Sequence, residues 1–159
     1  MKVYFAWSIR GWRDDKELYN LIIEYVAEYA EVLTEHIGEV TLSEMWEQKV
    51  TDEYIYTRDI KRIDEADMMI AEVTNPSLWV WYEIWYAEAR WIPVYCLFRN
   101  KDNKRASAMI SGNKNLKVMN YKTYGKELKD LISYIFSNDP KTQSTQMNRR
   151  LEARRISCA

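Results

Sequence analysis

The chain has 159 residues, of which 47% are apolar and 30% are charged, and its formal net charge is −1. This balance fits one globular domain with a hydrophobic core and excludes a disordered chain. The near-zero charge argues against a nucleic-acid scaffold or a membrane-surface protein, since both usually carry a basic excess. No apolar run approaches the length of a membrane span, no signal-peptide pattern opens the chain, and two cysteines make no disulfide framework. We therefore expect a cytoplasmic protein that binds neither a membrane nor a nucleic-acid polymer.

Strand-like and helix-like segments alternate along the sequence. Short apolar segments predict strands, in chain order, at 2–6, 32–34, 67–73, 93–98 and 116–119. Apolar residues at helical spacing predict the helices between them, at 13–30, 51–66, 77–90 and 125–136. Five strands interleaved with helices indicate an α/β sandwich around a mostly parallel sheet.

The composition changes near the end of the chain. Residues 139–159 are polar and basic, with five basic and two acidic side chains. We expect residues 1–138 to form the folded domain and residues 139–159 to form a tail without fixed structure. A weak phosphate-attracting arm is the alternative interpretation.

Two segments follow strands at positions where doubly wound sheets bind ligands. After the first predicted strand, Ser8-Ile9-Arg10-Gly11 places a hydroxyl, a guanidinium and a glycine at a helix entrance, a combination that suits an anion. A plain helix cap with an exposed arginine is the alternative. After the third strand comes Ser77, which by itself is more often an N-cap than a ligand. Glu83, in the helix that follows, would ordinarily be a solvated helix residue.

Three further candidates are weaker taken singly. Asp59 would by default be a helix-surface charge with an i,i+3 partner in Arg62. His36 is the only histidine, and one histidine without neighbouring ligands gives no metal site. Tyr4 lies in a strand and is one of 12 tyrosines, which favours a core position. The sequence contains no Walker A, G-x-S-x-G or Cys-x-x-Cys motif. Residue chemistry alone therefore predicts an anion-binding α/β domain.

Several motifs in one order carry a more specific signal. They are Tyr4-Phe5-Ala6-Trp7-Ser8-Ile9-Arg10-Gly11, Val32-Leu33-Thr34-Glu35-His36, Asp59, Ala71-Glu72-Val73-Thr74-Asn75-Pro76-Ser77-Leu78, Tyr82-Glu83 and Ser107-Ala108-Met109-Ile110. Together they resemble the nucleoside 2-deoxyribosyltransferase family, and within it the N-glycosidase branch that acts on 2'-deoxynucleoside 5'-monophosphates. The resemblance extends over residues 3–121.

This resemblance implies a flavodoxin-like sheet and a homodimer whose active sites share residues across the interface. Because a deoxyribose lacks the electron-withdrawing 2'-hydroxyl, its cation forms readily, and we expect no metal or other cofactor. Glu83 corresponds to the nucleophile that attacks the anomeric carbon, Asp59 to the acid that assists departure of the base, and Tyr4 to the residue that positions the nucleophile and the sugar. The 5'-phosphate pocket corresponds to Ser8, Ile9, Arg10, Gly11 and Ser77. Ser107 corresponds to a serine supplied by the partner subunit, and His36 to another pocket residue.

These residue types suit cleavage of an N-glycosidic bond. The sugar becomes positively charged as the bond breaks, so a carboxylate on that face stabilises it and can bond to it, while a second acid neutralises the leaving base. Water then hydrolyses the glycosyl–enzyme intermediate, which gives free base and 2-deoxyribose 5-phosphate. Two alternatives stay open: a transferase in which a second base resolves the intermediate, and a nucleotide-binding protein without turnover.

Tryptophan and glycine contents are both abnormal. Glycine occurs 4 times, where average usage would give about 11, and tryptophan occurs 7 times. Five tryptophans occupy positions where the resembled family typically has glycine: Trp7, Trp12, Trp79, Trp81 and Trp85. Trp91 lies between a predicted helix and strand, where a left-handed glycine cap is expected, and Trp46 lies in a predicted loop. We hypothesise that all seven are glycine in the native protein, because UGA is read as tryptophan in some genetic codes and as glycine in others. The alternative is an aromatic-rich pocket or core, which fits Trp85 passably and Trp7, Trp81 and Trp91 badly.

Overall fold

The computed structural model describes residues 1–8, 12–34, 51–100 and 104–144, and within these a five-stranded sheet organises the molecule. The strands are β1 (Lys2–Ala6), β2 (Glu31–Val32), β3 (Met68–Glu72), β4 (Val94–Arg99) and β5 (Leu116–Tyr121). All four strand pairs are parallel, and the strand order is β2-β1-β3-β4-β5. This is the flavodoxin-like order of a doubly wound sheet, as predicted.

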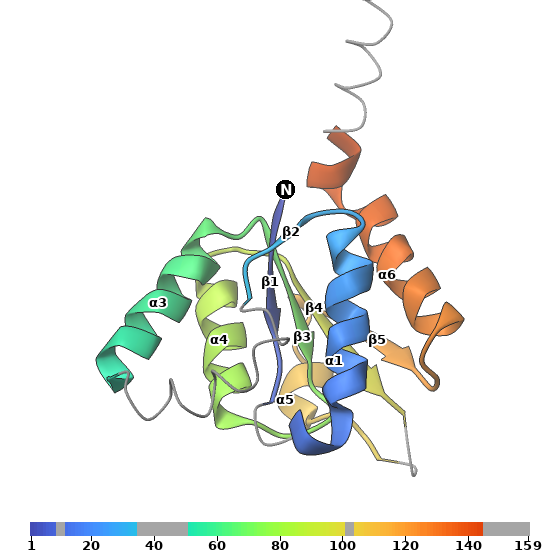
Figure 1. The fold of residues 1–159 in the computed structure, drawn as a ribbon, viewed down its shortest axis with the longest axis horizontal. Coiled ribbons are helices and arrows are strands. Elements are labelled where there is room, and N and C mark those ends of the chain that lie inside the picture. The colour runs from blue at the N-terminus through green and yellow to red at the C-terminus, as the bar shows by residue number, and fades with distance from the viewer. Residues whose placement is uncertain (9–11, 35–50, 101–103, 145–159) are drawn as a thin grey trace, which may run out of the picture.

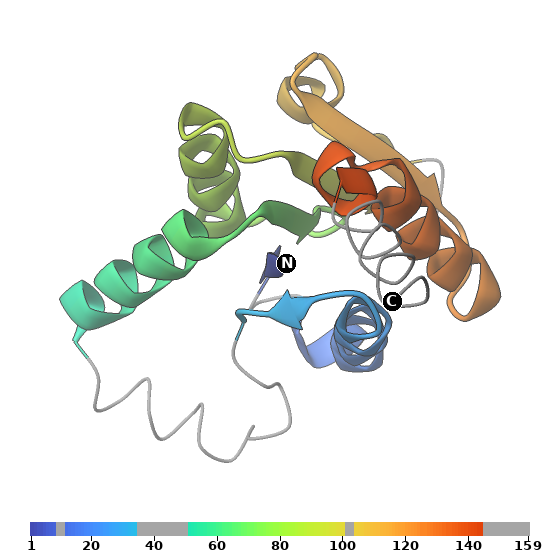
Figure 2. The same ribbon diagram turned by 90° about the horizontal axis from the view of Figure 1, so that it is seen from above.

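Helices cover both faces of the sheet and make three layers. They are α1 (Trp12–Ala27), α3 (Asp52–Glu65), α4 (Leu78–Ala89), α5 (Ala108–Ser111) and α6 (Lys126–Asn138). Helices α1 and α6 pack together on one face, while α3 and α4 pack together on the other (Figures 1 and 2). The strand order reverses between β1 and β3, so the ligand-binding crevice is expected where these two strands end.

The alternation of side chains along each strand divides the core into two clusters. In β1, Val3 and Phe5 point into the α1/α6 layer, whereas Tyr4 and Ala6 point into the α3/α4 layer. All five residues of β3 are buried, because both faces of this central strand are covered. Tyr4 therefore reaches the same layer as α4, the helix that carries Glu83.

Most predicted elements are present with small shifts at their ends. Thr51 and Ser77 are the N-caps of α3 and α4, and their hydroxyls accept backbone hydrogen bonds from Tyr54 and Val80. The second strand is shorter than predicted, and β5 continues two residues further, to Tyr121. The short helix α5 was not predicted, since four residues carry too little periodicity to detect.

Ordered structure passes the predicted domain boundary at residue 138. Residues 140–144 are helical, and Asp139 is buried, where its carboxylate accepts a hydrogen bond from the Tyr95 hydroxyl at 3.3 Å. The rest of the predicted tail, 145–159, lies outside the described residues. Among the described helices none combines the length and the apolar character that crossing a membrane requires.

Helix α4 ends in a Schellman motif centred on a tryptophan. The backbone N–H of Trp91 donates to the carbonyl of Glu88, and the N–H of Ile92 donates to the carbonyl of Ala87, each at 3.0 Å. Trp91 has φ +59°, and no other non-glycine residue in the described part of the chain has a positive φ. Its side chain is 90% exposed. The sequence prediction of a left-handed cap at this position is confirmed, and it is a conformation in which glycine is the usual residue.

Candidate active site

The Glu83 carboxylate lies at the boundary between β1 and α4 and is held there by two donors. The Tyr4 hydroxyl donates to its Oε1 at 2.5 Å, and the Trp79 indole N–H donates to the same oxygen at 2.8 Å. Trp79 reaches it because residues i and i+4 share one face of a helix. Glu83 is only 4% exposed, so the default prediction that it is a solvated helix residue is wrong.

A cavity of about 370 Å³ opens beside Glu83 between α3 and α4. Its lining combines two carboxylates with apolar and aromatic side chains; the residues are Asp52, Ile55, Tyr56, Asp59, Ile60, Ile63, Leu78, Trp79, Tyr82 and Glu83. Concave sites with few polar groups on an apolar wall are typical of small-molecule binding. The structure thus brings Glu83 and Asp59 to one cavity, as the family resemblance implied.

Asp59 differs from Glu83 in its surroundings. The Arg58 guanidinium donates to its Oδ1 at 2.8 Å, and Arg62 Nη1 lies 3.7 Å from the same oxygen. The predicted i,i+3 contact with Arg62 is therefore present. Asp59 is 8% exposed and is not a free surface charge, because its carboxylate lines the cavity wall. Two carboxyl groups with different partners around one cavity can take different roles in one reaction.

Burial sets the protonation of the Glu83–Tyr4 pair. Loss of water around Glu83, with a smaller contribution from the Asp59 charge, raises the pKa of Glu83 to about 8, although the hydrogen bonds from Tyr4 and Trp79 oppose the rise. Burial and the neighbouring carboxylate also raise the pKa of Tyr4 well above its usual range. The tyrosine hydroxyl therefore remains a donor, and the carboxyl group titrates close to neutral pH. Strongly shifted groups in a cavity are typical of active sites.

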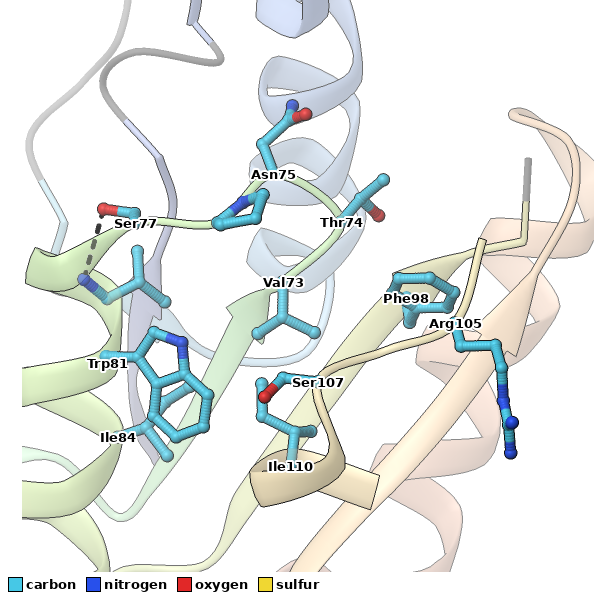
Figure 3. A pocket seen from close by; sticks show the side chains of 12 residues that line it. Val73, Thr74, Asn75, Ser77, Trp81, Ile84, Phe98, Arg105, Ser107 and Ile110 are labelled. Carbon is cyan, nitrogen blue, oxygen red and sulfur yellow. Dashed lines mark hydrogen bonds between the residues drawn. The ribbon is translucent and has the colours of Figure 1, made fainter. Parts of the chain in front are cut away.

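A second, smaller pocket of about 70 Å³ lies on the other side of α4. Figure 3 shows the 73–77 segment at its upper edge and Ser107, at the start of α5, across from it. Arg105 and Asn75 also line the pocket. The Ser77 hydroxyl caps α4 by accepting from the Val80 N–H at 3.5 Å. Ser77 and Ser107 thus line one pocket within a single chain, and this pocket shares no lining residue with the cavity of Glu83.

The remaining predicted binding residues are only partly placed. Ser8 is buried directly after β1. Ile9, Arg10, Gly11 and His36 lie outside the described residues, so their predicted phosphate and pocket roles stay predictions. Within the described ranges, no group of three or more His, Cys, Asp or Glu side chains is placed to hold a metal ion.

The tryptophans lie in different environments. Trp7 packs against the core, with its ring centroid 5.5 Å from that of Tyr19, although the sequence reasoning expected it to fit a core badly. Trp81 lines the small pocket and faces Ser107 across it (Figure 3). Trp85 is 61% exposed on α4. Trp46 and the side chain of Trp12 lie outside the described part of the chain.

The sequence reasoning missed the contact of Trp79 with Glu83, since helix spacing alone does not tell which helix face meets the sheet.

The parallel sheet carries a buried carboxylate beside β1, a second carboxylate that lines the same cavity and a helix-capping serine after β3, and two carboxyl groups at one cavity are the groups that cleavage of a glycosidic bond uses. Comparison with known proteins gives the family. The sequence model of the family described as nucleoside 2-deoxyribosyltransferase matches residues 3–130. The chain belongs to the nucleoside 2-deoxyribosyltransferase family.

Curated relatives cover almost the whole chain. The 5-hydroxymethyl-dUMP N-hydrolase of Tetraodon nigroviridis is 41% identical over 87% of this chain and 99% of its own length. The human protein of the same name is 36% identical over 89% of this chain and 82% of its own length. A Nematostella vectensis relative, provisionally named 2'-deoxynucleoside 5'-phosphate N-hydrolase 1, is 42% identical over 86% of this chain and 95% of its own length.

A solved structure supports the fold. The CMP N-glycosidase of Clostridium botulinum superposes with a TM-score of 0.54 over 84% of this chain and 98% of its own, at 20% sequence identity. At this identity the likeness concerns the architecture alone. The flavodoxin-like α/β class predicted from the sequence is therefore confirmed by both the strand order and a solved relative.

Proposed function

We propose that this protein hydrolyses the N-glycosidic bond of 2'-deoxynucleoside 5'-monophosphates and releases free base and 2-deoxyribose 5-phosphate. The relatives' names, N-hydrolases of a deoxynucleotide, support the reaction class. The observation that carries the proposal is the geometry around Glu83: a buried carboxylate, fixed by the Tyr4 hydroxyl, on the wall of a cavity that also exposes Asp59.

The mechanism assigns one role to each of these side chains. The ionised Glu83 oxygen attacks the anomeric carbon of the sugar, the bond from that carbon to the base breaks, and the electron pair leaves with the base nitrogen. Asp59 in its protonated form gives its proton to the departing base and becomes a carboxylate. Water then attacks the same carbon, its proton passes to the Asp59 carboxylate, and the bond to Glu83 breaks to release Glu83 as a carboxylate. Tyr4 holds the carboxylate by its Oε1, which leaves Oε2 to react.

We place the 5'-phosphate near the amino end of α4. Backbone N–H groups and the helix dipole favour an anion there, and the Ser77 hydroxyl adds a polar group at the same helix end. The Ser8–Gly11 segment follows the neighbouring strand and is proposed to complete the site.

We further propose a cytoplasmic homodimer in which Ser107 serves the partner subunit's site. Gel filtration with light scattering measures the oligomeric state, and a monomer would contradict this proposal.

The first experiment compares substrates and one variant. Release of base from a deoxynucleoside 5'-monophosphate is measured against the same deoxynucleoside without phosphate, with and without a free acceptor base. Hydrolysis that requires the phosphate supports the proposal, whereas base exchange that does not require it supports the transferase alternative. Glu83→Gln keeps the shape of the side chain but removes the charge, so we expect it to abolish base release while nucleotide affinity changes by only a few-fold. Activity of Glu83→Gln close to that of the parent would exclude Glu83 as the nucleophile.

A further inference from the structure

A buried carboxylate that the proposed reaction does not use lies at the end of the central strand. Glu72 is the last residue of β3 and is fully buried. Side chains alternate along a strand, so Glu72 faces the α1/α6 layer together with Met68 and Ile70, whereas Glu83 lines the cavity between α3 and α4. Burying a carboxylate is costly, and an apolar side chain of similar size would fill this place at a lower cost in stability. The contacts of Glu72 indicate which arrangement it maintains.

Three donors converge on the Glu72 carboxylate. The Thr74 hydroxyl donates to Oε1, the hydroxyl of Tyr121 at the end of β5 donates to the same oxygen at 3.1 Å, and the Thr74 backbone N–H donates to Oε2 at 3.3 Å. An ionised carboxylate accepts all three bonds, whereas a protonated one would place its own proton among donors. Loss of water raises the pKa of Glu72 to about 7, although the three donors and the charge of Arg99 oppose the rise. Above neutral pH the ionised form therefore dominates.

The second contact of the Thr74 hydroxyl fixes the direction of its bond to Glu72. The backbone N–H of Arg99, the last residue of β4, donates to Thr74 Oγ1 at 2.8 Å. The hydroxyl accepts this bond, and its single proton goes to the Glu72 carboxylate. The next residue is also held by its side chain, since Asn75 Nδ2 donates to the buried carboxylate of Asp15 at 2.8 Å. Two consecutive residues after β3 are thus bound to groups in the interior.

These contacts hold the turn that leads into α4 (Figure 3). Thr74 and Asn75 are held by their side chains, the ring of Pro76 restricts its own φ, and Ser77 is the N-cap of α4. The amino end of α4 is therefore placed relative to the ends of β3 and β4. In the proposed function this helix end receives the 5'-phosphate.

We propose that Glu72 is a positioning residue for the 5'-phosphate: it holds Thr74, and through the 74–77 turn it sets where the amino end of α4 meets the anion. This inference rests on the proposed function. Glu72 faces the opposite layer from the cavity of Glu83, so it acts through Thr74 and not by contact with the substrate. Loss of this contact weakens phosphate binding more than it slows bond cleavage.

The test measures, at pH 8, the affinity for 2-deoxyribose 5-phosphate by calorimetry and KM and kcat for the monophosphate. Glu72→Gln keeps the shape of the side chain but replaces one accepting oxygen by an amide group that donates. We expect the affinity to fall roughly ten- to hundred-fold, a loss that a displacement of about 1 Å can produce. KM for the monophosphate should rise by more than kcat falls.

Variants of Thr74 show whether Glu72 acts through this residue. Thr74→Val keeps the shape of the side chain and removes the hydroxyl, so it should lose affinity as Glu72→Gln does, while Thr74→Ser keeps the hydroxyl and should stay within a few-fold of the parent. Because both changes break the same contact, the double variant Glu72→Gln/Thr74→Val should lose much less than the product of the two single losses. Losses that multiply would overturn the proposal. The comparison of Thr74→Val with Thr74→Ser decides by itself if Glu72→Gln does not fold, and equal affinity of these two variants would also overturn it.

Asp139→Asn is the matched control, because Asp139 is a buried carboxylate that accepts from the Tyr95 hydroxyl and from the Lys141 backbone and makes no printed contact with the 74–77 turn. It should lower the melting temperature and leave the affinity unchanged. If Glu72→Gln binds the sugar phosphate as the parent does, or if Asp139→Asn loses as much affinity as Glu72→Gln, the positioning role is refuted while the proposed function stands. If the parent does not bind the sugar phosphate at all, the proposed phosphate site fails and this inference fails with it.

Discussion

Replacing Trp91 by glycine should stabilise the protein, and the size of the effect follows from the backbone. Trp91 has φ +59°, a conformation that costs a residue with a Cβ about 1–2 kcal/mol, while glycine adopts it without that penalty. The side chain is 90% exposed, so its removal loses little packing. Glycine makes the unfolded chain more flexible, which costs roughly 0.5–1 kcal/mol. The free energy of unfolding should therefore rise by about 0.5–1 kcal/mol, or roughly 1–4 °C in melting temperature for a chain of this size.

Thermal and urea unfolding of three variants test this reasoning. Trp91→Ala removes the same ring but keeps a Cβ, so it should be no more stable than the parent. Trp85→Gly changes an exposed tryptophan in the middle of α4, where glycine should destabilise by about 0.5 kcal/mol. Equal stability of Trp91→Gly and Trp91→Ala would refute the argument from φ.

The codons decide the origin of the seven tryptophans. UGA at all seven positions supports glycine in the native protein, and UGG at these positions excludes it.

Two further predictions concern the reaction. The ionised Glu83 carboxylate attacks, so kcat/KM of the parent should rise with pH and reach half its maximum near pH 8. Tyr4→Phe removes a hydrogen bond that lowers the pKa of Glu83, so this midpoint should move to higher pH. An unchanged or more acidic midpoint would contradict this role of Tyr4. Asp59→Asn should lower kcat by roughly 10²–10⁴-fold, and a substrate whose base departs more easily should lose less. Equal losses for good and poor leaving groups would remove Asp59 from the role of acid.

The architecture could be predicted because its signals are local. Short apolar segments predicted the strands, and Ser77 could be recognised as an N-cap before any coordinates. The left-handed position at Trp91 also follows from local reasoning, since it lies between a helix and a strand. The pairing of Tyr4 with Glu83, 79 residues apart, came only from the family resemblance.

The parts that were missed depend on long-range contacts. Asp15 and Arg99 look like ordinary charged residues in the sequence, yet they form a buried ion pair between α1 and the end of β4 although they lie 84 residues apart. The separate positions of the Ser77 pocket and the Glu83 cavity depend on which faces of α4 meet α3 and α5. Because α4 is apolar almost all round, the spacing of its apolar residues does not indicate which face packs against which neighbour.

The position of β1 has a consequence for how the chain is made. This strand is synthesised before the other four strands of the sheet, yet it occupies an interior place and pairs with β3 over four residues, beginning with Val3 opposite Met68. Its other neighbour, β2, pairs with only two of its residues. At synthesis rates of roughly 5–20 residues per second, an apolar strand therefore waits about 3–13 s for its main partner. During that interval its unpaired edge can join another nascent chain, so yield in a foreign host should depend on growth temperature and on holding chaperones.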